Sequence, residues 1–365
     1  MKRVLIVKMW ALGDVLMATP LLTNLRARFP GVEITWLIDS QHADVLRDHP
    51  LIDDLVVFDS GRWRRLLRGG RVLPWLTEGL ALHRRMRARR FDASINCHPE
   101  KWWTRLLCPA TVRVGLYPSP TLTATSRFYT YARPKPHGLH STDDYLLGLE
   151  ALGQSGPFDR RMALEVSEPS EGHCREFLRG QPGFRVGLPL VVLHPGTSQP
   201  SKCWPPENFA AVAASLLPRC NVVITGSANE RPLAEAISGL LPEGAEPPLI
   251  AAGRVGTIGA TAALIRQAAA VVTGDTSALH LASALGTPLV AIYGSTRPGD
   301  NAPLFGPNTL LYDDAVSCAP CYLARCPLTG ADHLHCQRAV TPSQALAALD
   351  VFLKGSKDYE RRHSE

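Results

Sequence analysis

A short polar segment at residues 274–277, Gly-Asp-Thr-Ser, combines residue types that bind phosphate groups. It follows an apolar, strand-like run and precedes a helical pattern at 278–286. A strand that turns into a helix in this way leaves the first backbone N–H groups of the helix unpaired, and the positive end of the helix dipole adds to them. Such a helix start favours a nucleotide or sugar nucleotide, and His280 can reach the same ligand one turn later. The simpler alternative is that Asp275 or Thr276 only caps the helix.

Three other polar loops also follow strand-like runs. They are Gly13-Asp14, residues 194–197 (His-Pro-Gly-Thr) and residues 226–230 (Gly-Ser-Ala-Asn-Glu). In open parallel sheets, ligands bind beyond the carboxyl ends of the strands. We therefore expect the four loops to line one cleft, which favours an active site over separate helix caps.

Strand-like and helical patterns alternate in both halves of the chain. We predict strands at 3–8, 33–38, 54–58, 93–96, 191–193, 222–225, 270–273 and 288–293, and helices at 15–28, 206–217, 258–269, 278–286 and 342–353. This alternation predicts an α/β protein with parallel sheets and crossover helices. A length of 365 residues favours two doubly wound domains. Their expected bounds are 1–167 and 190–341, separated by a Pro- and Gly-rich linker at 168–189 with one short helix near 174–178, and followed by a C-terminal helix and polar tail at 342–365.

The composition indicates a globular protein, with 45% apolar and 20% charged residues. The basic, apolar N-terminus is interrupted at Gly13-Asp14 and lacks a small-residue cleavage site, so we expect a buried strand there rather than a signal peptide. No uncharged apolar run is long enough for a membrane span. Nine cysteines without a secretion signal favour reduced thiols in the cytoplasm.

Positive charge is concentrated in the first half of the chain. The net charge is +6, yet residues 1–165 hold 24 basic and 16 acidic residues, and residues 62–105 alone hold 12 basic and 3 acidic residues. This part of the chain should therefore face an anionic partner. Nucleic acid is not the expected partner, because no nucleic-acid-binding module is visible.

Four segments together resemble the bacterial heptosyltransferases of lipopolysaccharide core synthesis, glycosyltransferase family nine. In order, they are GDVLMATPLLTNLRARFP, LHPGTSQPSKCWPPENFA, ITGSANERPLAEAI and GDTSALHLASALGTPLVAIYGSTRPGDNAPL. The resemblance extends through Leu349. It implies the GT-B fold, in which two Rossmann-like domains face each other across a cleft. It also implies an ADP-heptose donor, a lipid A–Kdo acceptor, and inverting transfer without a metal or other cofactor.

The resemblance assigns the two catalytic candidates. Asp14 matches the aspartate proposed as the family's base, and a carboxylate on a glycine loop can accept the proton of an acceptor hydroxyl. Its alternative role is to cap a helix that begins at Val15. Lys202 matches the family's donor-phosphate lysine and would stabilise the charge that grows on the leaving diphosphate. The sequence contains no Asp-x-Asp pair, which metal-dependent transferases often use to hold a cation.

Further candidates divide into donor-binding and acceptor-binding groups. Besides Lys202, the donor group comprises Gly13, Thr197, Ser198, Glu230, Asp275, Thr276, Ser277 and His280. The acceptor group, which suits phosphates and Kdo carboxylates, comprises Arg62, Arg64, Arg65, Lys101 and Arg105. The same basic stretches, with Trp63, Trp75, Trp102 and Trp103 between them, also suit the anionic inner face of the inner membrane, so we expect a cytoplasmic protein that binds that surface peripherally. A solvated basic helix face is the alternative.

Several interpretations stay open from the sequence alone. Cys318, Cys321, Cys326 and Cys336 have the residue types of a zinc site but not its usual paired spacing, so packed or reduced thiols are the alternative. The acceptor is Kdo or the first heptose, with a weak preference for the second-heptose branch. Other hypotheses are a related transferase with another donor or glycan, a sugar-nucleotide epimerase, and a non-catalytic nucleotide-binding protein that docks on membranes.

Overall fold

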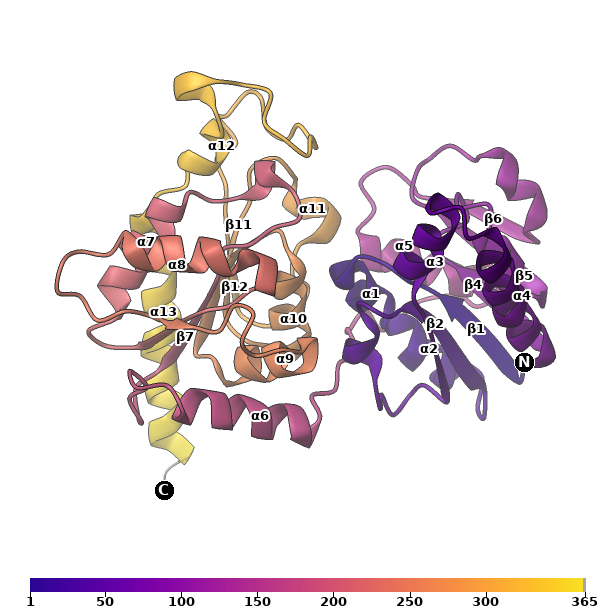
Figure 1. Ribbon diagram of the computed structural model, residues 1–365, viewed down its shortest axis with the longest axis horizontal. Helices are drawn as coiled ribbons and strands as arrows, with labels where there is room; N and C mark the ends of the chain where they lie inside the picture. The colour runs from indigo at the N-terminus through magenta and orange to yellow at the C-terminus, as the bar shows by residue number, and fades with distance from the viewer. Residues whose placement is uncertain (364–365) are drawn as a thin grey trace. The chain divides into compact units, whose positions relative to one another are not determined.

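The chain divides into two compact units, which we describe separately. The computed structural model describes the backbone of residues 1–363 and the side chains of residues 1–354. One unit comprises Met1–Glu165 with Gly299–Asn301, and the other comprises Val166–Pro298 with Ala302–Glu365. Each contains one six-stranded sheet with helices packed against it (Figure 1).

The sheet of the first unit has the order β3-β2-β1-β4-β5-β6, with all neighbouring strands parallel. Its strands are β1 (Arg3–Val7), β2 (Glu33–Asp39), β3 (Asp54–Phe58), β4 (Phe91–Asn96), β5 (Ala110–Tyr117) and β6 (Tyr131–Pro134). Its helices are α1 (Leu12–Ala18), α2 (Pro20–Arg28), α3 (Ser60–Arg68), α4 (Val72–Ala88) and α5 (Ser141–Glu150). The chain starts in the middle of the sheet, winds to β3 and crosses back to β4. This Rossmann order places the topological switch point between β1 and β4, where ligands bind in such folds.

The second unit repeats this topology. Its order is β12-β11-β10-β7-β8-β9, again fully parallel, so its switch point lies between β7 and β10. The strands are β7 (Leu190–His194), β8 (Asn221–Ile224), β9 (Leu249–Ile250), β10 (Ala270–Gly274), β11 (Leu289–Ile292) and β12 (Asn308–Leu311). The helices are α6 (Glu168–Arg179), α7 (Pro206–Leu216), α8 (Arg231–Gly239), α9 (Ile258–Gln267), α10 (Ser277–Leu285), α12 (His335–Arg338) and α13 (Pro342–His363). In the short helix α11 (Pro298–Asn301), Pro298 belongs to this unit and the other three residues belong to the first unit.

The central strands explain the long apolar runs of the sequence. In β1 every residue after Arg3 is buried, and all five residues of β7 and of β10 are buried, because helices cover both faces of a parallel sheet. The N-terminal run is therefore a buried strand, as predicted. Among the described residues, no helix has the length and apolar character needed to cross a membrane.

Two helical predictions are wrong in extent. The helix expected at 15–28 is two helices, α1 and α2, because Pro20 has no backbone N–H to continue the first one, and the Thr19 hydroxyl instead donates to the Leu16 carbonyl at 2.6 Å. The short helix expected near 174–178 is the twelve-residue α6. Ser167 caps its start, and it packs on α9 within the second unit.

Candidate functional site

A buried ion pair lies at the switch point of the second sheet. Lys202 ends a 3-10 turn, η4 (Pro200–Lys202), in the loop after β7, and Asp275 directly follows β10. Lys202 Nζ lies 2.6 Å from Asp275 Oδ2, and the Thr296 hydroxyl donates to the same oxygen at 2.9 Å. Burial favours the protonated carboxyl, but the Lys202 ammonium and these hydrogen bonds outweigh it and hold the pKa of Asp275 below its usual value. The pair therefore fixes the position of the Lys202 ammonium at the carboxyl edge of this sheet.

The start of α10 lies beside this pair. Thr276 is its N-cap, and the Thr276 hydroxyl accepts a hydrogen bond from the Ala278 N–H at 3.2 Å. Ser277 is the first helical residue, and His280 is buried one turn further on. The capping role proposed for Thr276 is thus present, whereas Asp275 bonds to Lys202 instead of capping the helix. A helix start next to an ammonium has the electrostatics of an anion site.

The loops after β7 and β8 are locked together by Glu230. Glu230 Oε2 accepts from the Ser227 N–H at 2.6 Å in a capping box, at the end of a 3-10 turn, η5 (Ala228–Glu230). A Cβ added to Gly196 would lie 2.0 Å from Glu230 Oε1, so any larger residue there would require the Glu230 side chain to move. Burial lowers the pKa of the neighbouring His194, although the Glu230 carboxylate acts in the opposite direction. Glu230 therefore shapes the site through its backbone contacts.

Two of the donor-binding candidates, Thr197 and Ser198, precede Lys202 in the same loop. The Thr197 hydroxyl is half-buried and donates to the Gln199 carbonyl at 2.6 Å, and Ser198 is exposed. Trp204, just after Lys202, is buried and donates through its indole to the Val340 carbonyl at 2.9 Å. The loop that carries Lys202 is thus anchored on both sides of the lysine.

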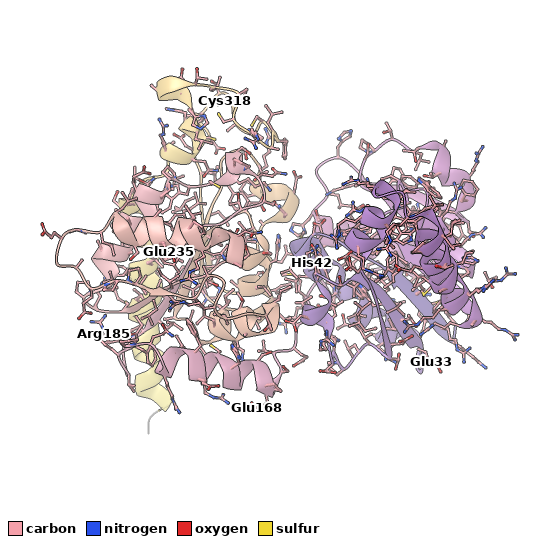
Figure 2. The ribbon with its side chains drawn as sticks, viewed as in Figure 1. Glu33, His42, Glu168, Arg185, Glu235 and Cys318 are labelled. Carbon is pink, nitrogen blue, oxygen red and sulfur yellow. The ribbon has the colours of Figure 1, made fainter. Side chains whose placement is uncertain are left out.

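The cysteine-rich segment supports that loop from outside the sheet. Ser201 N–H donates to the Ala324 carbonyl at 3.2 Å, and Gln337 donates to the Ser201 carbonyl at 3.2 Å. Cys318 lies on the projecting loop beside α12 (Figure 2). With three more cysteines it lines a cavity of about 70 Å³: Cys321, Cys326 and Cys336. Within the described part of the chain, no three His, Cys, Asp or Glu residues are arranged to hold a metal ion. The hydrogen bonds to Ser201 make the segment a support for the lysine loop.

In the first unit, Asp14 pairs with a buried lysine. Helix α1 begins at Leu12, so Asp14 lies within its first turn and makes no capping bond. Its Oδ2 is 3.1 Å from Lys8 Nζ, and Lys8 is 3% exposed while the Asp14 side chain is 40% exposed. The alternative role of Asp14, capping a helix that begins at Val15, is therefore wrong. A buried ammonium instead holds a solvent-accessible carboxylate at the carboxyl end of β1, beside the switch point.

The loop before Asp14 is strained and packed on aromatic rings. Ala11 has a φ of 62°, which L-residues rarely adopt and which occurs preferentially at functional sites. His98 Nε2 accepts from the Met9 N–H at 3.1 Å, and the Trp10 ring lies 4.5 Å from the His98 ring. Burial, with Lys8 and Lys101 adding to it, holds the pKa of His98 well below its usual range. A neutral imidazole from the loop after β4 therefore positions the loop that leads to Asp14.

A second carboxyl group, that of Asp144 on α5, interacts electrostatically with Asp14 and Lys8. It is buried, and its Oδ1 has no hydrogen-bond partner among the described residues. Burial raises its pKa to about 6, with Asp14 adding to the shift while Lys135 and Lys8 oppose it. The sequence does not predict a role for Lys8, His98 or Asp144, because none of them has a neighbouring residue that marks it as part of a site.

We expect Asp144→Asn to stabilise the protein at pH 8 by roughly 2 kcal/mol, and much less at pH 5. The folded protein binds a proton on Asp144 up to about pH 6, whereas the unfolded chain releases it near pH 4. The stability that this carboxyl contributes is therefore lost as the pH rises from about 4 to about 6. Asparagine cannot ionise, so the variant does not suffer this loss. Thermal unfolding at both pH values measures the effect. Glu150→Gln, on the exposed end of the same helix, is the matched control. An equal loss of stability at both pH values would contradict this account.

The acceptor-binding candidates all lie in the first unit. Three are exposed on α3, where Arg62 pairs with Glu78 of α4 at 2.8 Å: Arg62, Arg64 and Arg65. Lys101 and Arg105 follow β4, and the Arg105 guanidinium lies 3.9 Å from the centroid of the Phe128 ring. Arg105 is thus held against an aromatic ring and Arg62 is paired with Glu78, while Arg64 and Arg65 are exposed.

Two Rossmann-type sheets in one chain define the GT-B class of glycosyltransferases, and solved structures of that class match this one. A glycosyl transferase family 9 structure from Veillonella parvula DSM 2008 matches with a TM-score of 0.80 over 97% of both chains, at 22% identity. The E. coli heptosyltransferase WaaC, solved with ADP-2-deoxy-2-fluoro heptose, matches with a TM-score of 0.69 over 95% of this chain and 99% of that chain, at 21% identity. The predicted GT-B fold class is confirmed.

The chain belongs to glycosyltransferase family 9. The model of that family, described as glycosyltransferase family 9 (heptosyltransferase), matches residues 80–331. Lipopolysaccharide heptosyltransferase 1 of Pseudomonas aeruginosa is 27% identical over 343 residues, covering 89% of this chain and 87% of the relative. The protein is therefore a glycosyltransferase, as the resemblance implied.

Proposed function

We propose that this glycosyltransferase moves heptose from ADP-heptose to the inner core of lipopolysaccharide. The relative in Pseudomonas aeruginosa is named a lipopolysaccharide heptosyltransferase, and the E. coli neighbour is described with an ADP-heptose analogue. In this proposal the second unit binds the donor and the first unit binds the acceptor.

The observation that carries the proposal is the Lys202–Asp275 pair at the second switch point. An ammonium held by a buried carboxylate keeps a fixed place, so it can meet a diphosphate without first being ordered. Ser277 and the start of α10 supply further donors to the phosphates, with Thr197, Ser198 and His280 as the remaining donor-side contacts. Glu230 accepts hydrogen bonds from the ribose hydroxyls. The charge that develops on the leaving ADP is thereby stabilised by the protein's own groups.

Asp14 acts as the general base, next to the Gly13 backbone. Its carboxylate takes the proton of the acceptor hydroxyl as that oxygen attacks the anomeric carbon of heptose. The bond from the anomeric carbon to the diphosphate oxygen breaks in the same displacement, so the configuration inverts and ADP leaves. Lys8 is a positioning residue here, because it holds Asp14 at 3.1 Å and does not itself touch the reacting atoms. The proposal requires both units to contribute to one reacting complex.

The acceptor is a lipid A–Kdo glycolipid, bound through its anionic groups. The exposed α3 arginines with Lys101 and Arg105 supply the complementary charge. The same basic surface binds the anionic cytoplasmic face of the inner membrane, where each basic residue near the surface contributes about 1 kcal/mol. Kdo and the first heptose are the two acceptor sugars to be distinguished.

A mass-spectrometric assay of three donors against deacylated lipopolysaccharide cores of stepwise length tests this function. We expect heptose transfer from ADP-heptose to one core length only, with UDP-glucose and GDP-mannose unreactive, because the donor site is specific for its nucleotide and sugar together. The productive core identifies the acceptor sugar. ADP-heptose that is inert on every core would overturn the proposal, and donor consumption without any acceptor would indicate an epimerase instead.

A further inference from the structure

An apolar cavity of about 300 Å³ lies in the first unit, outside the groups assigned to transfer. Its walls come from α4 and from the segment after β4 that includes the 3-10 turn η2 (Thr104–Leu107). His83 Nδ1 on α4 lies 2.6 Å from the Leu106 carbonyl, so the two walls are tied together. The cavity is at the small end of the range of ligand pockets, which suits one narrow apolar ligand rather than a bulky one.

Stacked aromatic rings form the inner part of this cavity. The Trp63 and Trp75 rings stack with centroids 5.0 Å apart, and the Trp63 and Trp103 centroids are 5.3 Å apart. Gly79 on α4 makes room for this stack, since a Cβ there would lie 3.4 Å from the Trp63 ring. The buried indole N–H of Trp75 has no hydrogen-bond partner among the described residues. The apolar, aromatic lining matches a plain hydrocarbon chain.

The outer face of α4 is apolar where a helix in water would be polar. Leu73, Leu76 and Leu80 are spaced by three and four residues, so they share one face of the helix, and they are 73%, 44% and 50% exposed. Leu76 and Leu80 also line the cavity, as does Trp102, which is 53% exposed. A single small ligand would fill the cavity but leave these surrounding side chains in water. An extended apolar medium would fill the cavity and also cover the exposed side chains around it.

The charges around this surface favour an anionic medium. Arg84 and Arg87 continue the leucine stripe along α4, and Lys101 adjoins Trp102. Helix α3, which packs beside α4, carries four further arginines (Figure 1). Leucines and tryptophan next to lysine and arginine are the composition of a protein surface that lies in a membrane interface.

We propose that α4 and the 102–106 segment enter the interface of an anionic bilayer, and that the cavity takes one acyl chain of a bilayer phospholipid. Basic residues bind the headgroups, the exposed leucines enter the acyl boundary, and one chain reaches the tryptophan stack. Buried apolar area and electrostatic attraction to anionic lipids together set the strength of such interfacial binding. The inference extends the membrane binding in the proposed function, and it names the ligand that the cavity would hold.

Tryptophan quenching by brominated lipid tests the cavity directly. The probe is vesicles of phosphatidylglycerol with bromine on the acyl chains, compared with unbrominated vesicles and with phosphatidylcholine vesicles. We expect strong quenching with brominated phosphatidylglycerol. Gly79→Leu, which places a side chain in the cavity, should reduce quenching at least twofold while sedimentation with vesicles stays within threefold of wild type. Gly239→Leu, at a helix glycine of the second unit with open space around it, is the matched control and should quench like wild type.

The outcomes separate this inference from the proposed transfer reaction. Vesicle binding without acyl-chain quenching, or quenching that Gly79→Leu leaves unchanged, would overturn the acyl-chain site. Quenching by an acylated acceptor in micelles but not by phospholipid vesicles would also overturn it, since the occupant would then be the acceptor. Leu76→Gln with Leu80→Gln should weaken vesicle binding at least tenfold while turnover on a deacylated core stays unchanged. Normal quenching in a protein that transfers no heptose would leave this inference standing and remove the proposed function.

Discussion

Asp14→Asn is expected to lower kcat by roughly 1,000-fold, within the range that a general base contributes, while the Kd for donor stays within threefold. The amide has the size of the carboxylate but cannot take the proton of the acceptor hydroxyl. Donor affinity is preserved because, apart from the Gly13 backbone, the proposed donor contacts come from the second unit. Single-turnover assays give the rate of transfer, and titration calorimetry with ADP gives the affinity.

The control for this variant is Asp48→Asn. Asp48 is an exposed aspartate of the same unit, and its φ of 58° is one that asparagine adopts readily, so this substitution should change neither rate nor stability. Because Asp14→Asn leaves the buried Lys8 ammonium without its anionic partner, unfolding must be measured alongside turnover. Turnover within threefold of wild type, in a folded Asp14→Asn protein, would show that Asp14 is not the base.

Much of the fold is predictable from the sequence because strands buried on both faces stay apolar throughout. β1 and β10 are recognisable for this reason, and the alternation with helices indicates parallel sheets. The two-residue β9 is too short to produce a pattern. The break between α1 and α2 was missed because the apolar periodicity runs across Pro20, and only the missing N–H of the proline ends the first helix.

The site residues are predictable from the sequence only where they belong to a recognisable local motif. In the sequence, Gly13-Asp14 and Gly274-Asp275 each come after an apolar, strand-like run, which is enough to indicate a ligand site; in the structure the first pair lies in the first turn of α1 and the second spans the end of β10. The pairing of Lys202 with Asp275 is not visible in the sequence, since 73 positions separate them and only the adjacency of β7 and β10 brings them together. Asp144 gives no local signal at all, because its raised pKa arises from burial in the folded unit. The roles of these residues in transfer stay predictions that the variants test.

Lys202→Met is expected to raise the Kd for ADP about 100-fold and to reduce kcat/KM by at least as much. A charge-assisted hydrogen bond to phosphate contributes about 1.5–3 kcal/mol to the free energy of binding. The same contact strengthens in the transition state, because negative charge grows on the leaving diphosphate. The variant should also lose stability at pH 7 by about 3 kcal/mol or more, because it leaves Asp275 ionised and buried without its partner. Donor affinity by calorimetry and thermal unfolding measure the two effects separately.

Adding Asp275→Asn to Lys202→Met separates the role of the lysine in folding from its role in binding. Lys202 and Thr296 hold the pKa of Asp275 down, so the pair contributes stability that is present at neutral pH and is lost as the pH falls through the depressed pKa. Without the lysine, burial, the largest single cause, raises the pKa of Asp275 against the remaining effects of Thr296 and His280, so the stability penalty of the single variant should shrink from pH 7 to pH 5 as Asp275 takes up a proton. The double variant has no buried charge, so it should regain most of the lost stability at pH 7 while its donor affinity stays low. Recovery of donor affinity along with stability would mean that Lys202 only supports the fold, and the phosphate contact would then have to be assigned to the start of α10.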